Sequence, residues 1–124
     1  MRTQTEKIDF IDTFKLRLKN WIIQVLNICK TFPPNTITDV INDQLIKAAT
    51  STGVSHRAAC RAQSSREFFE KMSIAVEEAD KSLFWLEVID EKGIPCEKLE
   101  LIKLKHEIIE ILNILATARA NTKI

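Results

Sequence analysis

Glycine and proline are scarce in this 124-residue chain, which contains 2 glycines, 3 prolines and no tyrosine. Because glycine and proline interrupt helices and form turns, their scarcity argues against a fold of many short strands. The good helix formers Leu, Ile, Ala, Lys and Glu are abundant instead. The composition therefore predicts one all-α domain spanning residues 1–124, a length that can bury a hydrophobic core.

Long hydrophobic runs are also missing, since no apolar stretch approaches the roughly 18 residues of a membrane span. The first residues, MRTQTEKIDFID, carry charges where a signal peptide has its apolar core. The cysteines, Cys29, Cys60 and Cys96, are odd in number and include no C-x-x-C pair. Free thiols fit a reducing compartment. We therefore expect a cytoplasmic protein with no membrane partner.

The sequence lacks the common catalytic and nucleotide-binding signatures, including G-x-x-x-x-G-K-[ST], G-x-G-x-x-G and G-x-S-x-G. It also lacks the Glu-x-x-His motif of di-iron helical bundles. The crowded carboxylates Glu77, Glu78 and Asp80 are therefore interpreted as a charged helix face rather than a catalytic group.

His56 and Cys60 stand one helical turn apart and could supply two ligands to a metal, whereas zinc requires four. Arg57 and Arg61 flank Cys60 and could lower the pKa of its thiol, but no oxyanion hole or substrate pocket is evident. We expect a non-enzymatic protein with no catalytic residue, no cofactor, no metal and no small-molecule substrate.

Four segments show the apolar spacing of amphipathic helices. The predicted helices cover residues 6–30, 36–62, 65–91 and 95–120. The Phe32-Pro33-Pro34-Asn35 stretch separates the first two, and Thr36 is the expected cap of the second.

Two further breaks separate the remaining helices. Ser64 and Glu67 have capping-box spacing at the start of the third helix. Lys92-Gly93 ends that helix, and Pro95 suits the first turn of the fourth. Within the second helix, Ala49 and Gly53 form a small-residue face for close packing; the alternative is that Gly53 marks a bend.

Short connections make successive helices antiparallel neighbours, which predicts an up-down-up-down four-helix bundle. The first and fourth helices carry broader apolar faces than one bundle seam needs, which favours a homo-oligomer; a wide core seam is the alternative. The residues expected in the core or at a subunit interface are Trp21, Phe68, Trp85, Leu104, Ile108 and Ile111.

The net charge of +1 gives no overall basic excess, but cations gather in two places. The candidate contacts for nucleic acid or a partner are Arg57, Arg61 and Arg66 near the second turn, and Lys15 and Lys19 in the first helix. The alternative is that the arginines pair with Glu67 and Glu70 across the hairpin. Arginine suits either role, so both interpretations remain open at this point.

Residues 57–87, RAACRAQSSREFFEKMSIAVEEADKSLFWLE, resemble the signature of bacterial four-helix-bundle proteins related to the large-subunit rRNA intervening-sequence protein. Phe32-Pro33, Gln44-Leu45 and the Ala48-Ala49-x-Ser51 run match as well, so the resemblance covers roughly residues 10–118. Where relatives often read Gly-Ala-Asn-Tyr-Arg-Ala, this chain has Gly53-Val54-Ser55-His56-Arg57-Ala58.

This resemblance implies that the chain assembles as a homopentamer. The family has no established catalytic residues, so the resemblance implies none here. Members of the family are encoded within rRNA intervening sequences or stand alone. A related branch, the accessory variability determinant of diversity-generating retroelements, forms a basic pentameric barrel that binds reverse transcriptase and nucleic acid. The implied function is an accessory role in nucleoprotein assembly, contacting RNA, DNA or an RNA-handling enzyme such as a reverse transcriptase. The alternative is a structural or protein–protein interaction module without nucleic-acid affinity.

Overall fold

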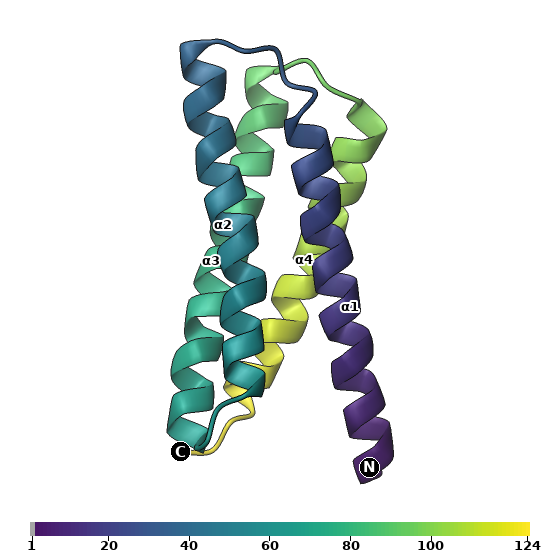
Figure 1. Cartoon of the computed structure of the whole chain (residues 1–124), viewed down its shortest axis with the longest axis vertical. Helices are drawn as coiled ribbons and strands as arrows, with labels where there is room; N and C mark the ends of the chain where they lie inside the picture. The colour runs from purple at the N-terminus through teal and green to yellow at the C-terminus, as the bar shows by residue number, and fades with distance from the viewer. Residues whose placement is uncertain (1) are drawn as a thin grey trace.

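The computed structural model describes residues 2–124, which form four helices joined by short turns (Figure 1). The helices are α1 (Gln4–Cys29), α2 (Thr36–Cys60), α3 (Ser65–Lys92) and α4 (Lys98–Ala120). They run alternately up and down, and residues 2–124 contain no strand. The predicted all-α four-helix bundle is confirmed, while its assembly as a pentamer stays a prediction. None of the helices in the described chain is both long and apolar enough to cross a membrane.

Side-chain caps fix where the first three helices begin. Thr3 and Glu6 form a complete capping box at the start of α1, two residues before the predicted start. Asn35 caps α2 by accepting a 2.9 Å hydrogen bond from the Thr38 amide, so Thr36 is the first helical residue and not the cap. Ser64 accepts from the Glu67 amide at 3.0 Å, as its spacing predicts.

The turn between α3 and α4 corrects the predicted start of the fourth helix. Gly93 ends α3 in the left-handed conformation with φ 75°, as expected of a C-terminal glycine. The chain then buries Ile94, and the Ile94 amide donates to the Ile89 carbonyl at 3.1 Å. Pro95 therefore lies in the turn, and α4 begins at Lys98 with the Glu97 side chain accepting from the Leu99 amide.

The core is centred on Trp21, whose side chain is 1% exposed and whose indole Nε1 donates to the Leu104 carbonyl at 3.1 Å. Leu104, Ile108 and Ile111 are buried with it, so these predicted packing residues lie inside the bundle rather than on a subunit surface. The other two predicted packing residues, Phe68 and Trp85, are half-buried against this core.

The first turns of α1 stand apart from the rest of the bundle (Figure 1). No residue from position 2 to 13 is buried, and Phe14 is the first core residue of α1. The apolar side chains of Ile8 and Ile11 are therefore exposed, as is Phe10 at 41%. The divergence leaves apolar surface on α1 that the single chain does not cover.

Gly53 lies within α2, which continues from Thr36 to Cys60, so it does not interrupt the helix. A Cβ atom at this position would collide with Cδ1 of Ile22 on α1. The absence of a side chain at Gly53 thus leaves room for the Ile22 side chain of α1. The small-residue pattern had instead predicted the close approach of another helix backbone. This contact brings the middle of α1 against α2, beside the residues of the candidate site.

Candidate nucleic-acid interface

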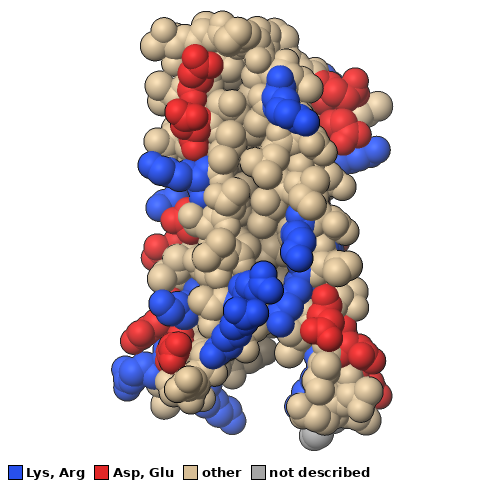
Figure 2. Space-filling view, viewed as in Figure 1, with Lys and Arg blue, Asp and Glu red and all other residues tan. Residues whose placement is uncertain are grey.

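Residues from both predicted basic clusters meet in one depression between α1 and α2. Lys15 and Lys19 come from α1, and Arg57 and Arg61 come from α2; we call the depression that they line the basic groove. Its volume is about 360 Å³. Its remaining lining residues are Leu18, Ile22, Thr50, Gly53, Val54 and His56. Figure 2 shows Lys and Arg atoms gathered over α1 and α2 in the middle and lower half of this face.

The four cations of the basic groove are free of internal ion pairs. Within residues 2–124, no carboxylate lies within 4.0 Å of their charged nitrogens. The predicted alternative, pairing with Glu67 or Glu70, is therefore not seen. The Glu67 carboxylate instead accepts a hydrogen bond from the Gln63 amide at 3.3 Å, just before the N-terminus of α3. Four like charges in one groove repel one another, and a bound anion would relieve that repulsion.

Arg66 does not join this groove. It lies in the first turn of α3, exposed and past the turn that separates α2 from α3. The three arginines that are close in sequence are therefore divided by the turn. Lys15 and Lys19, far from the arginines in sequence, take the place beside Arg57 and Arg61.

His56 also lines the basic groove and is 6% exposed. Its ring meets the Phe14 ring edge-on, with centroids 5.0 Å apart. Burial, with a smaller contribution from the positive charge of Lys15, lowers the pKa of His56 to about 4. The imidazole is therefore neutral at pH 7, adds no charge to the groove, and offers one donor and one acceptor nitrogen.

Cys60 lies one turn beyond His56, with its sulfur 3.5 Å from the imidazole Nε2. Burial raises the pKa of the Cys60 thiol, opposite to the lowering that its arginine neighbours could have produced. The thiol is therefore protonated at neutral pH, which disfavours it as a nucleophile. Elsewhere in residues 2–124, no group of three or more His, Cys, Asp or Glu residues is arranged to hold a metal ion.

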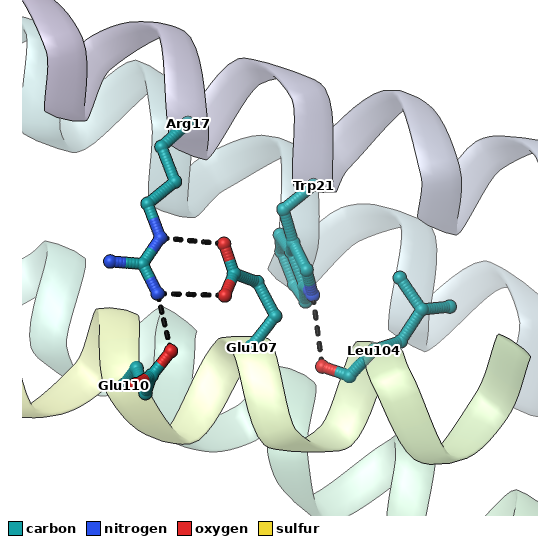
Figure 3. A network of polar contacts seen from close by, with 5 residues as sticks. All are labelled: Arg17, Trp21, Leu104, Glu107 and Glu110. Carbon is teal, nitrogen blue, oxygen red and sulfur yellow. Dashed lines mark hydrogen bonds and ion pairs between the residues drawn. The ribbon is translucent and has the colours of Figure 1, made fainter.

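Arg17 faces α4 rather than the basic groove (Figure 3). Its guanidinium makes a bidentate pair with Glu107 at 2.6 and 2.7 Å and also contacts Glu110. These hydrogen bonds lower the pKa of the Glu107 carboxyl. Sequence reasoning missed this bridge because 90 residues separate its partners. Arg17 lies between Lys15 and Lys19 in sequence, yet it serves the α1–α4 contact and not the groove.

The comparisons with known proteins bear on the fold. No family model matches this chain, and no curated protein matches it. Among solved structures, it is similar to a protein with unknown function from the S23 ribosomal protein family of Bacteroides thetaiotaomicron. The TM-score is 0.78 and the identity 23%, with 90% of this chain and 98% of that chain covered. At this identity the similarity establishes a shared four-helix fold and leaves the function to the site.

Proposed function

We propose that this protein is a non-enzymatic, self-assembling accessory protein that contacts the phosphates of RNA or DNA through the basic groove. One observation carries the proposal: two lysines of α1 and two arginines of α2 line a single depression without a carboxylate partner. Lysine and arginine contacts to phosphate supply most of the sequence-independent affinity for nucleic acid.

The family context agrees with this role. The similar structure bears the description of a ribosomal protein family, and the sequence resembles proteins encoded within rRNA intervening sequences. In a homopentamer the basic groove would recur on every copy, and several weak phosphate contacts would act together. The same arrangement would suit an accessory subunit that presents nucleic acid to an RNA-handling enzyme such as a reverse transcriptase.

The test is the salt dependence of binding. We expect the protein to bind a labelled RNA or DNA at low salt with an affinity that falls steeply as salt rises. Arg57→Ala combined with Arg61→Ala removes two cations from the groove and should reduce the slope of log K against log salt by roughly 2. Fluorescence anisotropy over a salt series measures both quantities.

A control variant separates the groove from net charge. Lys30 and Lys92 are exposed at the opposite end of the bundle, and replacing both with alanine removes the same charge. This variant should keep the wild-type slope. No binding at low salt, or equal slopes for the two double variants, would reject the phosphate-contact proposal.

The second candidate function is a protein–protein interaction module without nucleic-acid affinity. It is favoured by the large exposed apolar side chains that occur on α1 and α4, including Leu16, Ile23, Ile102 and Ile109. This candidate predicts assembly or partner binding that survives high salt, because apolar contacts are not screened by ions.

A further inference from the structure

A second depression adjoins the basic groove and shares two residues with it. Lys15 and His56 line both. The second depression, which we call the apolar cavity, has a volume of about 360 Å³ and lies where the first turns of α1 diverge from the bundle. Figure 2 shows the hollow between the lower end of α1 and the rest of the molecule.

Aromatic rings give the apolar cavity its character. Phe10 and Phe14 of α1 and Phe68 of α3 all line it. The Phe10 and Phe14 rings are nearly parallel, at an interplanar angle of 6° with centroids 6.4 Å apart. The guanidinium of Arg2 lies 4.2 Å from the centroid of the Phe10 ring. Arg2 lies outside the cavity lining, so the flat phenylalanine rings are the surfaces on which an unpaired base would stack.

Few polar side chains line the apolar cavity, and two of them, His56 and Cys60, come from α2. His56, neutral at pH 7, and the protonated thiol of Cys60 lie together on α2. They can hydrogen-bond to the polar edge of a ring whose faces lie against phenylalanine. Lys15 lines both the apolar cavity and the basic groove. A ligand could therefore place an anionic group in the groove and an aromatic ring in the neighbouring cavity.

We propose that the apolar cavity receives an unpaired base of a nucleic-acid strand whose phosphates lie in the basic groove. This inference rests on the proposed function and names its substrate class: single-stranded RNA or DNA. In a duplex the bases are stacked inside and reach such a cavity only after costly flipping. A single strand offers phosphate and base together, and the two depressions that would receive them adjoin through Lys15 and His56.

The experiment compares three ligands that differ in their bases. They are a short oligothymidylate, an abasic strand of the same length and a duplex, each measured by anisotropy on the full chain at one low salt concentration. We expect the oligothymidylate to bind roughly 5- to 150-fold more tightly than the abasic strand, the range that stacking of one base supplies. The abasic strand keeps the phosphate contacts, so it isolates the contribution of the base.

Substitutions then locate that preference. Phe10→Ala should abolish the difference between the base-bearing and abasic strands, and Phe10→Trp should retain it, because indole also stacks. Phe10 is 41% exposed, so its truncation leaves the core intact. Phe84→Ala is the matched control, because Phe84 is 53% exposed on α3 and lies outside the cavity lining.

The outcomes separate the two proposals. If the abasic strand and the duplex bind as tightly as the oligothymidylate, the base inference fails while phosphate binding stands. If none of the three ligands binds at low salt, the proposed function fails and the base inference with it. If Phe10→Ala changes the particle mass in light scattering but not the ligand preference, a second copy of this chain covers the cavity, and the inference is rejected.

Discussion

His56 sits beside four cations and Phe14, yet burial, more than charge, sets its protonation state. Cys29 gives a second case, since burial alone raises the pKa of its thiol to about 12. Arg17 differs from both, because its half-exposed guanidinium is held by an ion pair with the Glu107 carboxylate. At the scale of residues, the surroundings of each polar group therefore decide whether it is available to a ligand.

The first prediction concerns the pH dependence of stability. The pKa of His56 is about 4 in the folded protein against an ordinary value of 6.5 in the unfolded chain. Between these two pH values His56 is protonated in the unfolded chain and neutral in the folded protein. The contribution of His56 to stability is therefore complete above pH 6.5 and is lost as the pH falls toward 4. We expect His56 to contribute a loss of about 2 kcal/mol between about pH 7.5 and about pH 5.

Urea denaturation of three proteins at the two pH values isolates this contribution. His56→Gln should lose that part of the pH dependence, whereas His106→Gln, at an exposed position on α4, should retain it. An unchanged pH dependence in His56→Gln would show that carboxylates alone are responsible.

The second prediction ranks the two tryptophans. Trp21 is buried and hydrogen-bonded to the Leu104 carbonyl, whereas Trp85 is half-buried and stacks edge-on against exposed Phe84. Trp21→Ala should destabilise the protein by about 3–5 kcal/mol. Trp85→Ala should lower the free energy of unfolding by clearly less than Trp21→Ala, because the Trp85 side chain is only half-buried. Chemical denaturation measures both, and equal losses would contradict the placement of Trp85 at the edge of the core.

At the scale of elements, α1 is the helix whose contacts vary most along its length. Its first turns stand free, its middle presses Ile22 against Gly53 of α2, and Arg17 ties it to α4. The basic groove and the apolar cavity both lie along this helix. The angle at which α1 leaves the bundle thus shapes both depressions.

The third prediction tests the contact between α1 and α2. Gly53→Ala should gain helix propensity of about 1 kcal/mol, but its new methyl group must displace Cδ1 of Ile22. We expect the stabilisation to be smaller than that gain in the wild-type background and close to it in an Ile22→Val background, which lacks Cδ1. A double-mutant cycle of urea denaturations measures this coupling. Additive effects would mean that Ile22 moves aside without cost.

At the scale of the whole molecule, α1 and α4 leave large apolar side chains exposed on the single chain. Exposed isoleucines occur on both helices, including Ile8, Ile23, Ile102 and Ile109. Contiguous apolar surface on a protein of this size is typical of an association site. Closed rotational symmetry would bury the same surface on every copy.

The fourth prediction follows for the assembly. Light scattering of the purified protein should give a mass about five times the 14.2 kDa of one chain. Ile23→Glu combined with Ile109→Glu should dissociate the particle while the circular dichroism spectrum of the helices remains. Val40→Glu, at an exposed position of α2, serves as the control and should leave the mass unchanged if α1 and α4 form the interface. A monomeric wild-type protein at micromolar concentration would contradict the prediction.

The sequence by itself determined the four helices, because their causes are local. Apolar spacing, the Ser64 cap and the left-handed Gly93 each act within a few residues. Its errors were local as well: Pro95 resembles a helix start, but the burial of Ile94 delays α4 until Lys98. Pro95 favours an early start of α4, and the burial of Ile94 favours a longer turn. Which of the two prevails depends on the neighbouring helices that bury Ile94.

Only the tertiary structure decided which cations share a site. Lys15 and Lys19 line one groove with Arg57 and Arg61, and Arg66 lies outside it, because side chains from different helices set how α1 lies on α2. Packing depends on the volumes of residues far apart in the chain, and periodicity within one helix carries no record of them. The sequence therefore supplied the candidate residues, and the fold selected four of them and placed an aromatic cavity at their side.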